Sequence, residues 1–367
     1  MGRTDPRVVI AHDFLETYGG AERVTQELAI EFPDAPVVAI LGRPAVAMRM
    51  GIEGRWRPLL PPRPALLRGY RLLTPAFPAL VRAARLPEAD VLVSSSYAFA
   101  HQFRVPGAPH VCYCHSPLRF AWSMTDDYAQ RWAAGSVAGA AFRTLAALMR
   151  HSDRRAARRV SVYCTQSPFT ADQIERFYGR RAEVIGAPVD CDLFHPAADG
   201  DHDGYVLLCG RLIEPYKQMG IALDALRRLG RRVVVAGDGP AMAELRSRAG
   251  PEASFLGHLG DEDLVRVMQR AAFLLFPSRD DFGLIPVEAM ACGRPVLAYA
   301  GGGAQYTVVP GVTGELFPEQ TAACLASALE AFSPDRYATG EIRRHAEQWD
   351  RSVFRRRLRG VVLDALR

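Results

Sequence analysis

The feature that most constrains the fold is a short apolar run that ends in a polar, glycine-containing loop and is followed by a helical pattern. Residues 273–276 are apolar throughout, which indicates a buried strand. Pro277 and Ser278 end this run, and the pattern becomes helical from Pro286, because proline suits the first turn of a helix. A loop between a strand and a helix N-terminus offers backbone N–H groups and the positive end of the helix dipole to an anion. The stretch therefore predicts a βα unit with an anion-binding loop.

Two acidic residues flank this loop. Asp280 lies before Gly283, and Glu288 lies eight positions after Asp280, just inside the predicted helix. Carboxylates accept hydrogen bonds from sugar hydroxyls, so both side chains could border one sugar pocket. An ordinary βα unit that carries surface acids is the alternative interpretation of this stretch.

A second predicted βα unit carries basic residues. Residues 205–209 indicate a strand, and the loop after it contains Arg211 and Lys217. Among 45 basic residues, Lys217 is the single lysine. An ammonium is a compact point charge, whereas a guanidinium is a planar fork, so a site packed around a phosphate oxygen can require lysine. Arg211 and Lys217 could clamp a diphosphate from two sides, and an accidental lysine in the loop is the alternative.

The order of the motifs along the chain resembles that of the retaining glycosyltransferases of family 4. The motifs are Gly19-Gly20 after the first predicted strand, Arg211 and Lys217, Gly237-Asp238-Gly239, the acid pair Asp280 and Glu288, and the glycines 301–303. Residues 113–122, YCHSPLRFAW, are similar to the bacterial mannosyltransferase branch that builds surface polysaccharides. The resemblance covers nearly the whole chain and implies an α/β protein of the GT-B fold. That fold has two facing Rossmann-like domains with parallel sheets and a deep interdomain cleft.

The length agrees with two domains, because 367 residues suit two domains of roughly 150 residues each. We expect residues 1–186 to form an N-terminal, acceptor-side domain and the polar stretch at 187–204 to form the linker. Residues 205–345 are expected to form the nucleotide-sugar-binding domain. The resemblance implies that residues 346–367 form a helix that crosses back to the N-terminal domain.

The resemblance also implies roles in the donor site. Arg211 and Lys217 would stabilise the charge that builds on a leaving diphosphate. Glu288 would bind the ribose diol, and Asp280 would bind hydroxyls of the transferred sugar. The other expected donor-binding residues are Gly210, Gly237, Gly239, His258 near the nucleobase, and Phe282, Gly283 and Leu284 through their backbone N–H groups. The family usually has glutamate where this chain has Asp280, which leaves the sugar contacts and the donor identity open.

Further candidates lie in the first half of the chain. Gly19 and Gly20 would let the backbone approach a ligand closely, and the resemblance places their loop near the acceptor. Asp13 could accept a hydrogen bond from the acceptor hydroxyl, and bracing the loop is its structural alternative. His115 ends a predicted strand, where α/β sheets place ligand-binding residues. The resemblance implies that His115 faces the donor sugar. Arg119 is expected to shape the acceptor pocket.

The resemblance implies an enzyme that moves a hexose, with mannose favoured, from a nucleoside-diphosphate sugar to a hydroxyl of a glycan, glycolipid or small molecule. GDP-mannose is the first donor expected, and a UDP- or dTDP-sugar is the second. The configuration is expected to be retained by attack on the face from which the diphosphate leaves, because the sequence identifies no nucleophilic carboxylate. No metal and no cofactor beyond the donor is expected, since there is no DxD motif or His/Cys cluster of metal-ligand type. The rivals are a nucleotide-sugar epimerase of the same fold, a non-catalytic sugar-nucleotide binding protein, and a pyridoxal-phosphate phosphorylase with its Schiff base on the single lysine.

Bulk properties bear on location and partners. A formal charge of +5 favours anionic partners but is too small to indicate nucleic acid. Seven cysteines without CxxC pairs, no signal-peptide pattern and no run of 18 apolar residues predict a cytoplasmic protein without a membrane span. Residues 55–85 are rich in proline, leucine and arginine and contain no acid, so they are the candidate for peripheral contact with the inner face of a membrane. Packing against the N-terminal domain is the alternative for this segment.

Overall fold

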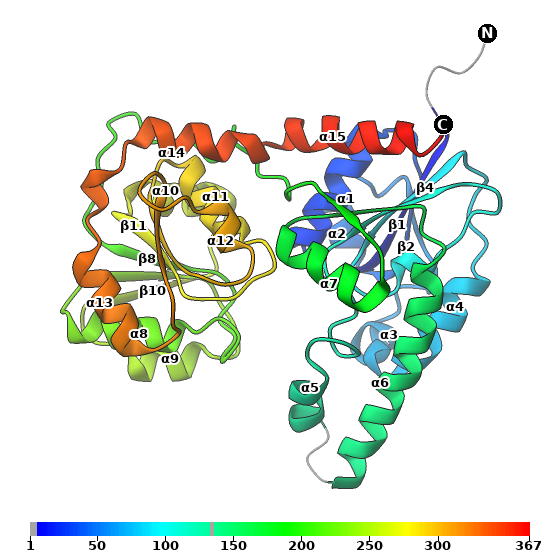
Figure 1. Cartoon of the computed structure of the whole chain (residues 1–367), viewed down its shortest axis with the longest axis horizontal. Helices are drawn as coiled ribbons and strands as arrows, with labels where there is room; N and C mark the ends of the chain where they lie inside the picture. Colours follow the sequence, from blue (N-terminus) through cyan, green and yellow to red (C-terminus); the bar gives the residue numbers. More distant parts are fainter. Residues whose placement is uncertain (1–5, 133–135) are drawn as a thin grey trace. The chain divides into compact units, whose positions relative to one another are not determined.

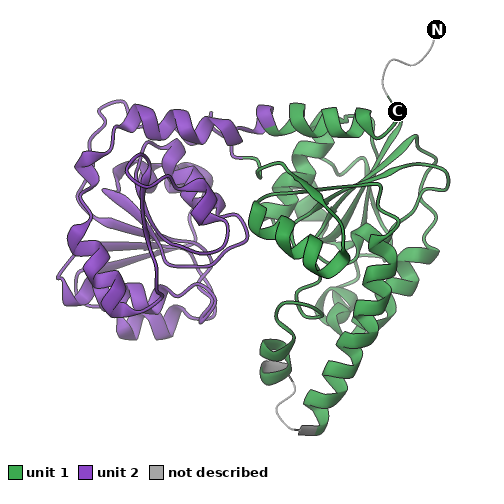
Figure 2. Ribbon diagram, in the orientation of Figure 1, with its two compact units in different colours: residues 1–188, 354–367 green, residues 189–353 purple. Residues whose placement is uncertain are grey.

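The chain folds into two compact units, which Figure 2 shows in different colours. The computed structural model describes residues 6–132 and 136–367, without the side chains of 131–136. The first unit extends to Pro188 and includes residues 354–367, and the second is Val189–Val353. Residues 189–204, expected to be a linker, thus count with the second unit, and the last fourteen residues count with the first.

In the first unit, the described residues form a seven-stranded parallel sheet with the order β3-β2-β1-β4-β5-β6-β7. The strands are β1 (Val8–Leu15), β2 (Val37–Gly42), β3 (Trp56–Pro58), β4 (Val91–Ser96), β5 (His110–Cys114), β6 (Val162–Thr165) and β7 (Ala182–Val184). The helices are α1 (Gly20–Glu31), α2 (Pro44–Arg49), α3 (Pro64–Gly69), α4 (Phe77–Ala83), α5 (Thr125–Trp132), α6 (Ser136–Ala157), α7 (Pro168–Tyr178) and α15 (Arg351–Asp364), with 3₁₀ turns η1 (Tyr70–Ala76) and η2 (Ala100–Gln102).

Both faces of this sheet are covered by helices, as Figure 1 shows. Side chains alternate between the faces of a strand. Val8 and Ile10 of β1 therefore pack in one core with α1 and with Phe354 of α15, whereas Val9 packs in the opposite core with α4 and with Met149 of α6. Strands buried on both faces read as continuous apolar runs, as β2 does over residues 37–41.

The second unit repeats the architecture with six parallel strands in the order β10-β9-β8-β11-β12-β13. The strands are β8 (Val206–Cys209), β9 (Val233–Ala236), β10 (Ala253–Gly257), β11 (Phe273–Phe276), β12 (Val296–Tyr299) and β13 (Gly314–Phe317). The helices are α8 (Met219–Arg228), α9 (Met242–Arg248), α10 (Asp261–Arg270), α11 (Leu284–Ala291), α12 (Ala304–Thr307), α13 (Ala322–Ala331) and α14 (Thr339–Ala346), with η3 (Pro334–Arg336) and η4 (Glu347–Trp349). One core packs the central strands against α8, α9 and α13.

The structure confirms the expected α/β class with two parallel sheets. The predicted helix after residue 286 begins two residues earlier, at Leu284. Residues 55–85 form a short edge strand, two short helices and a 3₁₀ turn, as their prolines predict. Across residues 6–132 and 136–367, no helix has both the length and the apolar character that a membrane crossing requires.

Candidate functional site

The second unit has a topological switch point between β8 and β11. Counted from β8, its strand order is 3-2-1-4-5-6, so the chain turns in opposite directions after these two central neighbours. In open parallel sheets, ligands bind beyond the carboxyl ends of the strands at the point where the order reverses. The loop after β8 carries Arg211 and Lys217, and the loop after β11 carries Asp280. The two loops singled out in the sequence therefore flank the switch point.

Lys217 and Asp280 meet directly at this point. Lys217 Nζ donates to Asp280 Oδ2 at 2.5 Å, and the two side chains are only 11% and 19% exposed. The second carboxylate oxygen, Oδ1, is buried and has no hydrogen-bond partner in the structure, and the same holds for Ser278 Oγ. A buried acceptor without a partner is costly in a folded protein, so these oxygens mark a place where a ligand or water would complete the hydrogen bonding.

The helix after this loop begins with an open N-terminus. Gly283 is the N-cap of α11 with φ of 85°, a left-handed conformation that favours glycine, and no side chain caps the helix. The first N–H groups of a helix have no partner within it, so those that follow Phe282 can serve an anion or a hydroxyl oxygen. Glu288 lies in the second turn of α11 and is almost completely buried.

Close packing between two loops explains the glycines after β8 and β9. Gly210 and Gly237 have φ of 136° and 138°, and a Cβ added at Gly237 would overlap the carbonyl of Gly210. A Cβ at Gly239 would likewise overlap the carbonyl of Leu212. The hydrogen bonds Gly210 N to Ala236 O and Leu212 N to Asp238 O continue the parallel pairing beyond the strands. These glycines thus join the loops to each other, a role that the sequence did not reveal.

The remaining donor-site candidates lie at the same edge of the sheet. Arg211 is exposed at the end of β8, and His258 is exposed directly after β10. Gly303 donates its N–H to Asp280 O at 2.7 Å, so the triple-glycine loop is fastened to the loop after β11. Sequence reasoning missed Glu214, whose carboxylate accepts the N–H groups of Met219 and Gly220 and so fills the N-terminus of α8.

The first unit has its own switch point, between β1 and β4, and Asp13 fills it. The Asp13 carboxylate accepts four backbone N–H groups, from residues 97–100, at 2.5 to 2.9 Å, and the side chain is fully buried. A carboxylate that is saturated in this way has no free oxygen for an acceptor hydroxyl. The expected acceptor contact of Asp13 is therefore wrong, and bracing of the loop after β4 is its role.

His115 lies at the end of β5 and is nearly buried. Its Nε2 is 2.8 Å from Ser95 Oγ, and its backbone carbonyl accepts the side-chain amide of Gln166 at 3.0 Å. Burial lowers the pKa of His115 to about 3, and nearby His12 adds to this effect. The ring is therefore neutral at physiological pH, and it can donate one hydrogen bond and accept another.

The loop before α1 is held by Glu22. Gly19 is the N-cap of α1, and its N–H donates to Glu22 Oε2 at 3.0 Å, which is the half of a capping box that a glycine N-cap allows. Gly19 has φ of −144°, which any residue adopts, so its conformation does not require glycine. Gly20 begins the helix. Arg119 is half-buried in the loop after β5, with its Nε 3.3 Å from Ser116 Oγ.

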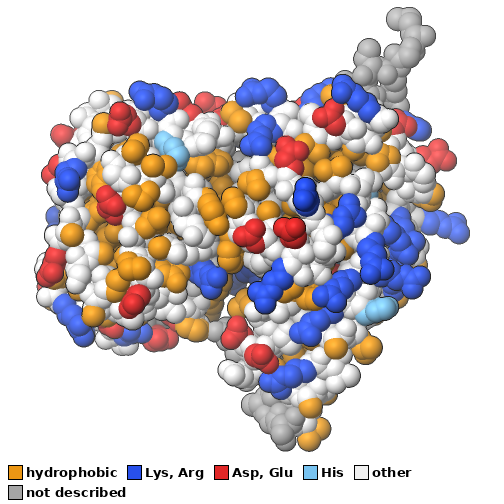
Figure 3. All heavy atoms as spheres, viewed as in Figure 1, with side chains coloured by type: hydrophobic (Ala, Val, Ile, Leu, Met, Phe, Trp, Pro, Cys, Tyr) orange, Lys and Arg blue, Asp and Glu red, His pale blue; other side chains and the backbone are white. Residues whose placement is uncertain are grey.

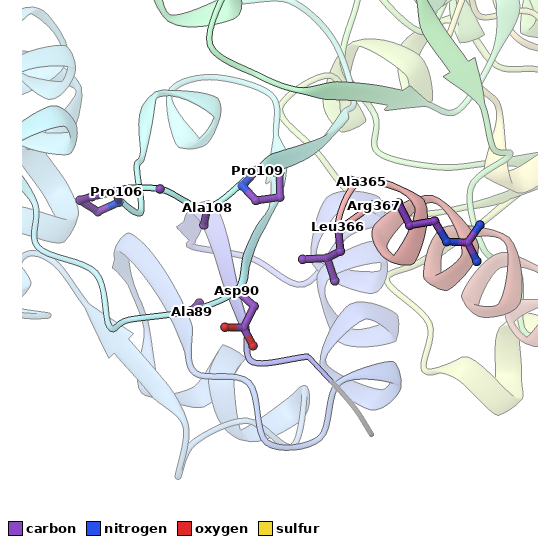
Figure 4. Close-up of a pocket in the computed structure, with 9 residues that line it drawn as sticks. Ala89, Asp90, Pro106, Ala108, Pro109, Ala365, Leu366 and Arg367 are labelled. Carbon is purple, nitrogen blue, oxygen red and sulfur yellow. The ribbon is translucent and has the colours of Figure 1, made fainter. Parts of the chain in front are cut away.

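A pocket of about 700 Å³ in the first unit lies away from these residues. It is lined by residues 89 and 90, 106–109 and 365–367, which Figure 4 shows. Asp90 and Pro109 directly precede β4 and β5, so this pocket is at the amino ends of the strands, and Asp90 is already bound by Arg7. Within the described ranges, no group of three or more His, Cys, Asp or Glu side chains could hold a metal ion.

Comparison with known families covers most of the chain. Residues 18–193 match a family model described as Glycosyltransferase Family 4, and residues 203–335 match one described as Glycosyl transferases group 1. These two segments contain every candidate residue discussed above except Asp13 and His12.

Two relatives of known name are similar in sequence. D-inositol 3-phosphate glycosyltransferase 1 of Catenulispora acidiphila is 32% identical over 197 residues, which are 45% of this chain and 47% of the relative. The D-rhamnosyltransferase WbpZ of Pseudomonas aeruginosa is 29% identical over 202 residues, 51% of this chain and 53% of the relative. The chain thus spans about half the length of these relatives. Neither is named as a mannosyltransferase, so the branch expected from residues 113–122 remains a prediction.

Solved structures match over almost the full length. The HepE protein of Anabaena, in complex with UDP-glucose, has a TM-score of 0.72 at 18% identity and covers 98% of this chain and 100% of its own. Sucrose-phosphate synthase from Thermosynechococcus elongatus has a TM-score of 0.70 at 19% identity, with 98% and 99% covered. At this identity the likeness shows a shared fold.

Proposed function

Because the chain belongs to the glycosyltransferases of group 1 and family 4 and has their GT-B fold, we propose that it moves a hexosyl group from a nucleoside-diphosphate sugar to an acceptor hydroxyl. The observation that carries this proposal is the contact between Lys217 and Asp280 at the switch point of the second unit. An ammonium and a carboxylate with a free oxygen stand side by side there, beside an uncapped helix N-terminus. Those are the groups that a sugar diphosphate needs: a cation and N–H donors for phosphate, and an acceptor for sugar hydroxyls.

The leaving group determines what the cations do. When the bond from the anomeric carbon to the diphosphate breaks, negative charge grows on the phosphate oxygens. Lys217, exposed Arg211 and the first N–H groups of α11 would stabilise that charge without a metal ion, and donors held in place before the reaction stabilise the transition state most. The free Oδ1 of Asp280 would accept a hydroxyl of the sugar, and Glu288 would bind the ribose.

We propose retention of configuration, with the acceptor attacking the face from which the diphosphate departs. A double displacement would need a nucleophilic carboxylate at the anomeric carbon. The two acids considered for the donor site have other proposed partners: Asp280 is ion-paired with Lys217 and would bind a sugar hydroxyl, and the buried Glu288 would bind the ribose. A leaving phosphate oxygen would then take the proton of the acceptor. Trapping of a glycosyl-enzyme intermediate would contradict this route.

A sugar of mannose configuration is the proposed group, with GDP-mannose as donor. D-rhamnose is 6-deoxymannose, so the name of the D-rhamnosyltransferase relative supports this configuration. The UDP-glucose bound to HepE supports a UDP-sugar as the second candidate. Asp280 is one methylene shorter than the glutamate that the family usually has at this position. The shorter side chain would leave more room beside the sugar, which is compatible with either donor.

The test is a panel of sugar nucleotides, each incubated with the protein and followed by mass spectrometry. Release of the nucleoside diphosphate from GDP-mannose, lost in Lys217→Ala, supports the proposal, and GDP-mannose is eliminated if it neither binds nor turns over. Conversion to another sugar nucleotide without an acceptor would indicate the epimerase. Binding without turnover of any donor would indicate a binding protein.

We also propose that residues 55–85 bring the first unit to an anionic membrane surface that carries a glycolipid acceptor, at the inner face of the cytoplasmic membrane. The exposed residues of this segment combine apolar side chains with six arginines, and Leu72 is 87% exposed. Figure 3 shows arginine side chains gathered over the first unit. Arginines near anionic lipid contribute about 1 kcal/mol each, and exposed leucines can enter the interface.

Co-sedimentation with vesicles tests this surface. Arg68→Glu with Arg71→Glu is expected to abolish binding to vesicles that contain phosphatidylglycerol, and binding of the wild type to neutral vesicles should be weak. Arg227→Glu with Arg228→Glu is the matched control, because this exposed pair lies on α8 of the second unit. Equal loss in both variants would show that net charge, and not this segment, is responsible.

A further inference from the structure

A continuous chain of buried polar side chains runs through the first unit to His115. The parallel register of β1 and β4 places His12 directly beside Ser95. His12 Nε2 is 3.5 Å from Glu22 Oε1, its Nδ1 is 3.2 Å from Ser95 Oγ, and Ser95 Oγ is 2.8 Å from His115 Nε2. At 3.5 Å the contact between His12 and Glu22 is longer than a normal hydrogen bond, so the chain proper consists of His12, Ser95 and His115.

The partners of His12 determine where the hydrogens lie. Its Nδ1 is 3.1 Å from the carbonyl oxygen of Ser95, which can only accept, so Nδ1 must carry a hydrogen and donate. The same N–H points at Ser95 Oγ and at Thr25 Oγ1, 3.2 and 2.9 Å away. Thr25 Oγ1 is the nearest of these oxygens, and Thr25 gives its own hydrogen to the carbonyl oxygen of Ala21. Because Nδ1 of His12 already carries a hydrogen, it cannot accept the hydrogen of Ser95, which is left for another acceptor.

Two acceptors compete for the hydroxyl hydrogen of Ser95. His115 Nε2 is 2.8 Å from Oγ, whereas the carbonyl oxygen of Ala21 is 3.4 Å away. A hydroxyl donor prefers the shorter distance, which is the usual length of such a bond. The neutral His115 ring then accepts at Nε2 and must carry its hydrogen on Nδ1.

We propose that Ser95, oriented by His12, is a positioning residue that holds His115 as the neutral tautomer with its hydrogen on Nδ1. This makes Nδ1 a fixed donor for an oxygen atom of the substrate. In the opposite tautomer the same nitrogen would be an acceptor and could not bind an alkoxide or phosphate oxygen. The part that concerns substrate rests on the proposed function, whereas the tautomer is a property of the free protein.

The neighbouring residue on β4 supplies a matched control. Ser94 and His110 form an equally buried serine–histidine pair, with Ser94 Oγ 2.7 Å from His110 Nε2. Successive residues of a strand point to opposite faces, so Ser94 lies on the other face of the sheet from Ser95. Ser94→Ala removes the same kind of bond at the same depth without touching His12 or His115.

The first arm of the experiment measures the tautomer in the absence of substrate. The full-length protein is labelled with ¹⁵N-histidine, and the ring nitrogens of His115 are assigned by their loss in His115→Gln. We expect a pyridine-like Nε2 and a protonated Nδ1 in the wild type and in Ser94→Ala, and a change toward the other tautomer in Ser95→Ala. A protonated Nε2 in the wild type overturns the proposal, whether or not any sugar nucleotide is turned over.

The second arm measures steady-state transfer from the donor that the sugar-nucleotide panel identifies. Ser95→Ala is expected to lower kcat by about tenfold with little change in KM, which corresponds to about 1.4 kcal/mol, while Ser94→Ala keeps the wild-type kcat. Ser95→Cys retains a weak donor and should recover part of the loss; it also serves if Ser95→Ala does not fold. Equal losses in the Ser94 and Ser95 variants, or an unchanged kcat in Ser95→Ala, would overturn the inference. A protein that transfers no sugar but shows the expected tautomer would contradict the proposed function alone.

Discussion

Replacement of Lys217 separates the contribution of its ion pair to stability from its contribution to transfer. Lys217 Nζ and Asp280 Oδ2 are 2.5 Å apart with little exposure to solvent. At an effective dielectric constant of about 20, charges at this separation attract each other by roughly 7 kcal/mol. Desolvation of the two groups offsets much of this attraction, so the net contribution of the pair is small compared with the gross value.

Breaking one side of the pair is costlier than removing both sides. Lys217→Met leaves the carboxylate of Asp280 mostly buried without its cation, and we expect the free energy of unfolding to fall by about 3 kcal/mol. Adding Asp280→Asn removes the stranded charge, so the double variant should return to within about 1 kcal/mol of the wild type. Urea denaturation followed by circular dichroism measures both values.

Activity should respond in a different way. Both variants lack the ammonium that we propose stabilises the leaving diphosphate, so we expect kcat to fall by roughly 100- to 1000-fold in each, as for the loss of a preorganised donor. Lys217→Arg keeps the charge, but the guanidinium is larger, and Nζ lies 5.4 Å from the ring centre of Tyr216 and 5.9 Å from that of Phe276. Compared with Lys217→Met, Lys217→Arg should therefore recover more of the stability than of the activity. If the double variant recovered transfer together with stability, Lys217 would be a structural partner of Asp280 and the reasoning about the diphosphate would be refuted.

Three further predictions concern the framework of the two units. Asp13→Ala should leave the four N–H groups that its carboxylate binds without an acceptor. We expect the free energy of unfolding, measured by urea denaturation, to fall by about 3 kcal/mol or more. An unchanged stability would contradict the bracing role. Gly237→Ala should weaken binding of UDP or GDP by at least tenfold in calorimetry, because its Cβ overlaps the Gly210 carbonyl, whereas Gly260→Ala meets open space and should bind normally. Burial lowers the pKa of His110 to about 3, so between pH 6.5 and 3 the unfolded chain binds a proton that the folded chain does not. As the pH is lowered from 6.5 toward 3, the free energy of unfolding should therefore decrease by about 1.4 kcal/mol per pH unit for this group. In His110→Gln, the free energy of unfolding measured with urea should depend correspondingly less on pH.

Much of the fold could be predicted because parallel strands buried on both faces appear as apolar runs. Residues 273–276 and 8–11 are such runs, and both are central strands in the structure. The candidate site could be predicted from two distinctive features of the sequence: Lys217 is the single lysine, and Asp280 lies eight positions before Glu288. That Lys217 and Asp280 touch could not be predicted, because their contact depends on two loops 63 residues apart in sequence.

The sequence does not show which groups already have partners within the fold, and Asp13 is the clearest case. Asp13 reads as a free acid after a strand, yet its oxygens are taken up by backbone N–H groups from a loop more than 80 residues away. The donor-binding role of Gly237 and Gly239 stays a prediction, and the structure adds that the carbonyls of Gly210 and Leu212 leave no room for a side chain at these positions. In both cases the partner comes from a distant segment.

The two switch points differ in the same respect, and this difference explains why the donor is assigned to the second unit. Each sheet has the central order 3-2-1-4-5, so each offers backbone N–H groups after its fourth strand. In the first unit, those N–H groups are neutralised internally by the carboxylate of Asp13. In the second, the corresponding loop holds Asp280 turned toward Lys217, and the helix that follows has no side-chain cap. At the switch point of the first unit, an anionic diphosphate would be repelled by the Asp13 carboxylate that already occupies the N–H groups. At the switch point of the second unit, it would meet a cation and the N–H groups of an uncapped helix. We therefore expect the anion to bind at the switch point of the second unit, because Asp13 already occupies the corresponding N–H groups of the first.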